Sequence, residues 1–125
     1  MVSFLVPQPC VSAANRREHH HARARRVKRE RAAAWACTLG VRGSLPAWPW
    51  RVTYERLGGR ELDYANLVSG FKAFEDGVVV DAGGHDDRPR SGYRGVYEQR
   101  KPDPGRGEEG GTVRVTIEPI GGGGP

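Results

Sequence analysis

The stretch ELDYANLVSGFKAFEDG, residues 61 to 77, carries side chains at spacings that suit chemistry on phosphate esters. Asp63 lies near its start, Lys72 follows nine positions later, and Asp76 comes one helical turn after Lys72. A second acidic pair, Asp86 and Asp87, follows in the next stretch. Carboxylates drawn together repel one another unless a cation neutralises them, and oxygen ligands suit Mg²⁺. Such a cation can activate water and polarise a phosphodiester while a lysine stabilises the developing charge, so the pattern indicates metal-assisted phosphodiester hydrolysis.

Each of these residues also has an ordinary structural interpretation. Asp63 is placed to cap a helix that begins at Tyr64, because a carboxylate there accepts from free backbone N–H groups. Lys72 and Asp76 form an i, i+4 pair, which on an exposed helix contributes only a few tenths of a kcal/mol. Asn66 could satisfy a buried backbone group. Both interpretations stay open at this stage.

Two helices are predicted to position these side chains. From Tyr64 to about Val80, apolar residues recur at spacings of four, three and four, the pattern of an amphipathic helix: Leu67, Phe71, Phe74 and Val78. From about Ala22 to Thr38 the chain is rich in alanine and arginine, both strong helix formers. The weak apolar stripe of this helix consists of Ala24, Val27, Arg31, Trp35 and Thr38.

Four strands complete the predicted fold. Val2 to Val6 is a short strand, and residues 48–56 alternate, with Trp48, Trp50, Val52 and Tyr54 on one side. Residues 93–100 and 112–118 are the last two strands, and DAGGHDDRPRSG before them is a loop by composition. The order β-α-β-α-β-β predicts one α+β domain over residues 1–118, a mixed sheet with two helices packed on one face. Residues 119–125 are predicted to form a flexible glycine-rich tail.

Composition narrows the class of protein. A chain of 125 residues builds one small domain, and a net charge of +5 favours an anionic partner such as nucleic acid. Cys10 and Cys37 are too far apart for a CxxC site and fit a reduced, cytoplasmic protein. No apolar run approaches the roughly 20 residues that cross a bilayer, and the first residues lack the pattern of a signal peptide. We therefore expect a cytoplasmic protein without a membrane partner.

A basic segment leads into the first predicted helix. Between Arg16 and Arg31 there are eight Arg or Lys residues and two acids. A solvated helix face is the alternative, but the arginines surround too much of the helix for a thin solvent stripe, and phosphate contacts dominate nucleic-acid affinity. The predicted DNA-binding residues are Arg16, Arg17, Arg23, Arg25, Arg26, Lys28 and Arg29.

Histidines and tryptophans form two further groups. His19, His20 and His21 would point in different directions on a helix or strand, which makes a poor metal site, so we interpret them as loop residues near phosphate. The three tryptophans are predicted to lie in the core, because a small chain needs large apolar side chains to build one: Trp35, Trp48 and Trp50.

The same residues carry a resemblance to a known family. LDYANLVSGFKAFEDG, followed by HDD and then YEQRK, resembles the RusA family of Holliday-junction resolvases, common in phages and prophages. The N-terminal ANRREHHHARARRVKRER is similar to the Asn-containing loop and basic first helix of one branch, so the resemblance covers most of residues 1 to 118. It implies a Mg²⁺-dependent endonuclease that resolves four-way DNA junctions in recombination and repair. A homodimer is implied too, because two opposed strands must be cut and a two-fold axis supplies two equivalent sites.

The resemblance also implies roles for individual residues. Asp63 would be a catalytic, metal-binding aspartate, Lys72 the catalytic lysine, and Asp86 or Asp87 the later metal ligand. The motif residues would be Asn66 and, one turn after the lysine, Asp76.

One position departs from the family pattern. Where the family has a second aspartate just before the asparagine, this chain has Ala65, which can neither bind a metal nor accept a proton. Losing one carboxylate from a small cluster weakens cation affinity and water positioning, although Asp81 or the spare member of the Asp86-Asp87 pair could compensate. The alternative function is a branched-DNA-binding protein with impaired cleavage. A third is a basic phage protein that binds RNA or protein.

Overall fold

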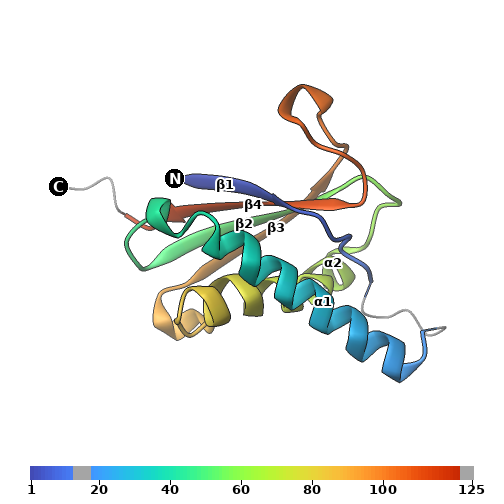
Figure 1. The fold of residues 1–125 in the computed structure, drawn as a ribbon, viewed down its shortest axis with the longest axis horizontal. Helices are drawn as coiled ribbons and strands as arrows, with labels where there is room; N and C mark the ends of the chain where they lie inside the picture. The colour runs from blue at the N-terminus through green and yellow to red at the C-terminus, as the bar shows by residue number, and fades with distance from the viewer. Residues whose placement is uncertain (13–17, 122–125) are drawn as a thin grey trace.

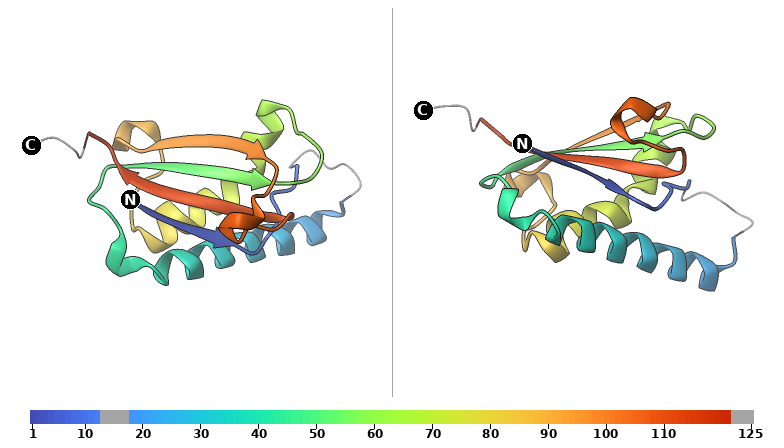
Figure 2. Two further views of the ribbon diagram at one scale, coloured as in Figure 1. Left: turned by 90° about the horizontal axis from the view of Figure 1, so that it is seen from above. Right: turned by 45° about the horizontal axis from the view of Figure 1, so that its top comes forward.

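The computed structural model describes residues 1–12 and 18–121, and it shows a four-stranded sheet covered by helices on one face (Figures 1 and 2). The strands are β1 (Val2–Val6), β2 (Trp50–Leu57), β3 (Arg94–Arg100) and β4 (Thr112–Pro119), in the spatial order β1-β4-β2-β3. β2 and β3 are parallel, whereas β4 is antiparallel to both β1 and β2. The predicted α+β fold with a mixed sheet is confirmed.

Alternation along the strands places one set of side chains beneath the helices. In β2, Trp50, Val52 and Tyr54 are buried, as the alternation predicts. Opposite them in β4, Val115 pairs with Tyr54 and Ile117 pairs with Val52, and both are fully buried. These inward positions form the core against the helical layer, since successive residues of a strand point to opposite faces.

Helix α1 (His20–Leu39) packs through a different face from the predicted one. Its buried residues are Glu30, Ala34 and Thr38, whereas Val27 and Trp35 of the predicted stripe are 39% and 44% exposed. Thr38 of the predicted stripe is thus buried, but Val27 and Trp35 are not, and the prediction that Trp35 belongs to the core is wrong. Two polar side chains could take the inward positions because Glu30 pairs with Arg26 at 3.1 Å and the Thr38 hydroxyl donates to the Ala34 carbonyl at 2.7 Å.

Of the other two tryptophans, Trp50 is buried and Trp48 is half-buried against the core. The His85 ring stacks on Trp48 with 3.8 Å between ring centroids. This contact anchors the loop between the second helical region and β3.

The second helical region crosses from β2 to β3 in three pieces: α2 (Tyr64–Gly70), α3 (Lys72–Glu75) and the π-helical segment η2 (Asp76–Ala82). The predicted helix is in place, but it is interrupted at Phe71. The four apolar residues predicted to face the core are all buried: Leu67, Phe71, Phe74 and Val78. Lys72 therefore stands at the first position of a new helical piece.

The other face of the sheet holds a segment, residues 101–111, that contains the short helix η4 (Pro104–Arg106) and projects above the sheet in Figure 1. The buried Glu108 carboxylate accepts from the Arg100 guanidinium at 2.6 and 2.8 Å and from the Asp103 amide at 2.9 Å, and it also pairs with Arg114. Hydrogen bonds from Arg100 hold the pKa of Glu108 well below its ordinary value, despite burial. This network fixes the segment to the sheet.

At its C-terminal end β4 closes against the start of β2, where the Ile120 amide donates to the Pro49 carbonyl at 3.0 Å. Within the described residues, no helix is both long and apolar enough to cross a membrane.

Candidate active site around Lys72

Lys72 lies between two carboxylates at the surface of the helical layer. Its ammonium Nζ is 2.8 Å from Asp87 Oδ2 and 3.1 Å from Asp76 Oδ1. The lysine side chain is 62% exposed, while those of Asp76 and Asp87 are only 21% and 15% exposed. A cation with one open side, held by two partly buried acids, is thus presented to solvent.

The electrostatics of the cluster keep Lys72 and Asp87 charged. Partial burial would raise the pKa of Asp87, but the hydrogen bond and charge of Lys72 outweigh it and hold that pKa below its ordinary value. Burial would lower the pKa of Lys72, but the hydrogen bonds and charges of the Asp87 and Asp76 carboxylates outweigh it and raise that pKa. At neutral pH the site therefore contains the Lys72 ammonium and the ionised Asp87 carboxylate.

The loop after η2 separates the roles of its two adjacent acids. Asp86 Oδ1 accepts from the Arg88 amide at 2.9 Å, and the Arg88 guanidinium reaches Asp86 Oδ2 at 2.7 Å. These hydrogen bonds lower the pKa of Asp86 to about 2. The Ser91 hydroxyl donates to the Asp86 carbonyl at 2.6 Å, which tightens the same turn. Asp86 thus organises the loop, and Asp87 is the member that contacts Lys72.

Helix α1 contributes Arg31 to the edge of the cluster. Its Nη1 is 3.6 Å from Asp76 Oδ2, and its Nη2 donates to Asp81 Oδ1 at 2.8 Å. The approach is close because Gly77 of η2 has no side chain: a Cβ there would lie 2.4 Å from the Arg31 carbonyl oxygen. Asp81, considered as a compensating acid, is already paired with this arginine.

Behind Lys72, Glu75 is buried in a cluster of tyrosine hydroxyls. Its Oε2 accepts from Tyr93 at 2.5 Å and from Tyr97 at 2.7 Å, and Tyr54 lies 2.9 Å from the Tyr93 hydroxyl. Burial raises the pKa of Glu75 although both tyrosines oppose the shift. Gly95 leaves the space for the Tyr97 hydroxyl.

Glu75 was not among the predicted site residues. A signal existed, because Glu75 follows the core residue Phe71 by four positions and therefore shares its helix face.

Asp63 caps α2, as its ordinary interpretation predicts. One carboxylate oxygen accepts from the Asn66 amide at 2.9 Å, and the other accepts from the Asn66 side chain at 2.8 Å. The neighbouring Leu62 exchanges two hydrogen bonds with Gln99 near the C-terminal end of β3. Asp86 and Asp87 instead precede the N-terminal end of that strand. The structure thus brings Lys72, Asp76 and Asp87 together, and it records no contact between Asp63 and that group.

The acidic side chains offer few ligands for a metal ion. Among the residues that the structure describes, no group of three or more His, Cys, Asp or Glu side chains is arranged to hold a metal. The gathered carboxylates are the pair Asp76 and Asp87, which share Lys72. Mg²⁺ commonly binds proteins through one or two carboxylates and completes its shell with water and substrate phosphate. The pair offers two such carboxylates, and in this structure the Lys72 ammonium lies between them.

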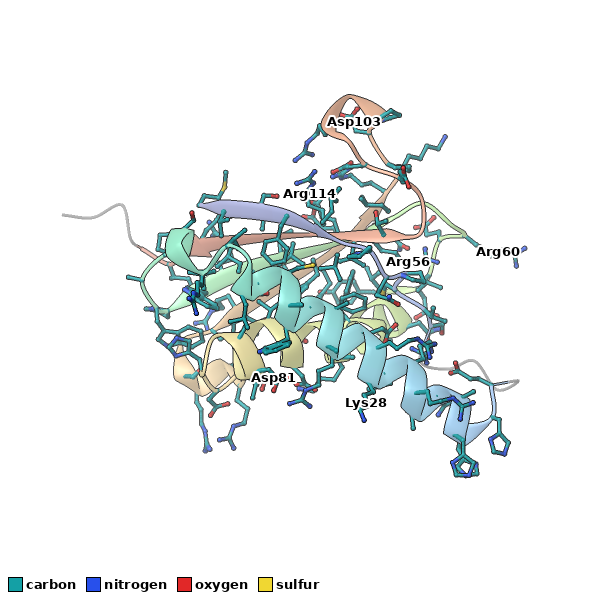
Figure 3. All side chains as sticks on the ribbon, in the orientation of Figure 1. Lys28, Arg56, Arg60, Asp81, Asp103 and Arg114 are labelled. Atoms are coloured by element: carbon teal, nitrogen blue, oxygen red, sulfur yellow. The ribbon has the colours of Figure 1, made fainter. Side chains whose placement is uncertain are left out.

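The predicted DNA-binding residues differ in their surroundings. Arg25, Lys28 and Arg29 are exposed along α1, and Figure 3 labels Lys28 on the helical layer. Arg26 is largely buried, because its guanidinium pairs with Glu18 at 2.8 Å and with Glu30, so it has an internal role. Arg23 lies 3.7 Å from Glu18. Arg16 and Arg17 fall outside the described residues.

The three adjacent histidines lie at the start of α1, where their rings contact one another. His19 is the N-cap, and its Nδ1 accepts from the His21 amide at 3.2 Å. His20 and His21 are exposed helical residues.

A groove joins the basic helix to the Lys72 cluster. It has a volume of about 130 Å³ and is lined from one side by Arg23 and Arg26 of α1, and from the other by Ser69, Lys72 and Asp76. Comparison of the chain with protein-family models, with curated proteins and with solved structures found no match. The geometry around Lys72 and the sequence resemblance therefore supply the grounds for a function.

Proposed function

We propose that this chain is a RusA-like endonuclease that binds branched DNA, in particular four-way junctions, and hydrolyses phosphodiesters at the Lys72 site with Mg²⁺. The observation that carries the proposal is the placement of Lys72 between Asp76 and Asp87. The resemblance implies that Lys72 is the catalytic lysine, that Asp87 or Asp86 is a metal ligand and that Asp76 is a motif residue. Asp87 comes from a loop 15 positions further along the chain, so the fold itself assembles the group.

The chemistry follows from the charges of this group. Asp76 and Asp87 would hold Mg²⁺, which supplies Lewis-acid polarisation of the phosphate and an activated water when bound. The exposed Lys72 ammonium is positioned to donate a hydrogen bond to a phosphate oxygen and to stabilise charge that develops there. The predictions that Asp63 and Asp86 are metal ligands stay predictions. In this structure the Asp63 carboxylate accepts from Asn66 and the Asp86 carboxylate accepts from Arg88.

Binding of the DNA backbone would come from α1. Arg25, Lys28 and Arg29 are exposed cations, and the groove beside their helix leads to Lys72. The homodimer expected from the resemblance would present two such sites to opposed strands.

The second candidate is a branched-DNA-binding protein that does not cleave. Two observations favour it: Ala65 is exposed in the first turn of α2 and offers no carboxylate, and both oxygens of Asp63 are occupied by Asn66.

Cleavage and retention of a synthetic four-way junction, measured with and without Mg²⁺, test the proposal. Lys72→Met and Asp87→Asn should each reduce Mg²⁺-dependent cleavage by about a hundredfold or more, the size of losing a group that stabilises the transition state. Glu98→Gln, at an exposed position of β3, is the control and should cut like the wild type. Full cleavage by folded Lys72→Met protein would show that Lys72 takes no part in cleavage. Junction binding without cleavage by the wild type would favour the second candidate.

Ala65→Asp separates the two candidates further. The position is exposed, and a carboxylate in the first turn of a helix gains roughly 0.3 to 1 kcal/mol from the dipole, so the fold should tolerate it. We expect the substitution to raise Mg²⁺-dependent junction cleavage while junction affinity changes little. If the wild type cuts as fast as this variant, another acid already fills the role; if neither cuts as a folded dimer, the protein is a binder.

A further inference from the structure

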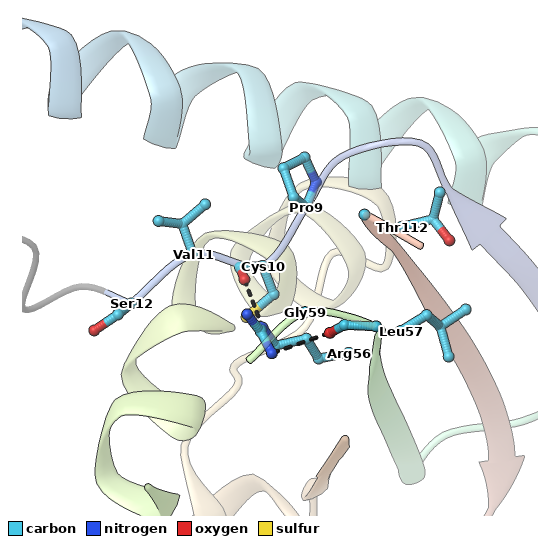
Figure 4. A pocket seen from close by; sticks show the side chains of 10 residues that line it. Pro9, Cys10, Val11, Ser12, Arg56, Leu57, Gly59 and Thr112 are labelled. Carbon is cyan, nitrogen blue, oxygen red and sulfur yellow. Dashed lines mark hydrogen bonds between the residues drawn. The ribbon is translucent and has the colours of Figure 1, made fainter. Parts of the chain in front are cut away.

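At the C-terminal end of β2, the Arg56 guanidinium is held by carbonyl oxygens. Its Nε donates to the Cys10 carbonyl at 2.9 Å, and its Nη1 donates to the carbonyls of Gly58 and Arg60 at 3.1 and 2.7 Å. Figure 4 shows this side chain beneath the Cys10 carbonyl. In the described part of the chain, no carboxylate pairs with Arg56. Its orientation is therefore fixed while its positive charge is not neutralised.

Two grooves flank this guanidinium. One, of about 230 Å³, is lined by residues that include Cys10, Gly58 and Gly111, and the other, of about 330 Å³, by residues that include Gln99 and Lys101. Arg56, Gly58 and Gly59 line both.

The glycine turn leaves the outer end of the guanidinium uncovered. Gly58 and Gly59 have φ angles of +77° and +81°, which favour glycine, and a Cβ at Gly59 would lie 2.9 Å from Arg56 Nη2. No described residue accepts a hydrogen bond from that Nη2. The end of Arg56 that faces the grooves thus keeps free donors.

The surroundings of these grooves are positive. Lys101 lines the larger groove and is exposed, and Arg60, also exposed, lies at the same end of the sheet as Arg56 (Figure 3). Arg100 is neutralised by its pairs with Glu55 and Glu108, and Glu61 is the acid that lines the larger groove. A planar guanidinium of fixed orientation beside further cations matches the geometry of a phosphate group.

We propose that Arg56, with Lys101 and Arg60, forms a phosphate-binding site for the backbone of a DNA strand. This inference rests on the proposed function, and it adds a DNA contact beside residues 9–12. Val11 lines both the smaller Arg56 groove and the groove that contains Lys72. A strand seated at Arg56 can therefore continue past Val11 toward the Lys72 cluster.

Inorganic phosphate is the first probe, because its binding requires neither DNA nor cleavage. In a titration of ¹⁵N-labelled protein followed by NMR, phosphate should shift the Arg56 Nε–H and Gly59 amide signals. Lys101→Gln should weaken that affinity by about threefold, the size of an exposed ionic contact. Arg94→Gln is the matched control: Arg94 is an exposed arginine whose guanidinium donates to the Pro89 and Tyr93 carbonyls, and the variant should titrate like the wild type.

The second arm uses a four-way junction and the salt dependence of its affinity. The double variant Arg60→Gln/Lys101→Gln should reduce the slope of log affinity against log salt by about two, since each lost phosphate contact removes roughly one unit. Arg56→Gln is less suitable alone, because it also removes three carbonyl contacts; both substituted side chains of the double variant are exposed. Absence of phosphate shifts at Arg56 and Gly59, or an unchanged slope in the double variant, would overturn the site. If the protein binds phosphate at Arg56 but does not cleave junctions, the phosphate-binding site is supported and only the proposed endonuclease activity is refuted.

Discussion

Gly77→Ala is expected to destabilise the protein by separating α1 from η2. The added Cβ would lie 2.4 Å from the Arg31 carbonyl oxygen, 2.8 Å from Ala34 Cβ and 3.0 Å from the Trp35 amide nitrogen. Two of these three atoms belong to the backbone of α1, which cannot rotate away, so the helices must move apart by roughly an ångström.

The magnitude follows from two opposing effects. Overpacking costs typically 1–3 kcal/mol, and contact with backbone on a fully packed helix favours the upper end, about 3 kcal/mol. Replacing a helical glycine with alanine returns about 1 kcal/mol. The free energy of unfolding should therefore fall by about 2 kcal/mol, which for a domain of this size lowers Tm by about 8 °C.

Urea and thermal unfolding, followed by far-UV circular dichroism, measure this change. Gly43→Ala is the control, because Gly43 has no neighbouring atom within 4 Å of an added Cβ, and its stability should change by less than about 0.5 kcal/mol. Equal stability of Gly77→Ala and the wild type would refute the inferred close contact. Since Arg31 also pairs with Asp76 and Asp81, the variant should lose junction cleavage along with stability.

Two further predictions concern charge. Replacing Arg25, Lys28 and Arg29 with alanine should reduce the salt slope of junction binding by about 2.7, because each phosphate contact contributes roughly 0.9; an unchanged slope would mean that this helix face is only solvated. Glu75→Gln should alter the pH dependence of stability. Burial raises the pKa of Glu75 in the folded state. The protonated carboxyl therefore contributes stability at low pH, and this contribution is lost as the pH rises through the raised pKa. Between about pH 4 and pH 8, urea unfolding should show that the free energy of unfolding of the wild type falls relative to that of Glu75→Gln. A difference between the two proteins that does not change with pH would contradict the burial effect.

Local patterns in the sequence determined much of the fold. The alternation in β2 predicts its buried face because a strand has only two sides, and the core positions of the second helical region follow from the spacing of Leu67, Phe71, Phe74 and Val78. The Asp63 cap was also predictable, since capping depends on residues within one turn. These features need no knowledge of distant contacts.

Other features depended on tertiary contacts. The prediction for α1 was wrong at Trp35 because the approach of α1 to Gly77 selects Ala34 as the inward residue. Glu30 can be buried on that face because Arg26, four positions earlier on the same helix, pairs with it. The sequence pattern does not show which face of α1 meets Gly77.

The site divides in the same way. The sequence predicted that Asp63, Lys72 and the Asp86-Asp87 pair converge. The structure joins Lys72 to Asp87 and Asp76, whereas Asp63 pairs with Asn66. Only the folded loop decided that Asp87 meets Lys72 while Asp86 binds Arg88, because two neighbouring aspartates are equivalent until hydrogen bonds fix the turn between them. Arg56 is fixed partly in the same way: the fold brings the Cys10 carbonyl beside it, whereas the Gly58 and Arg60 carbonyls belong to the turn that follows Arg56.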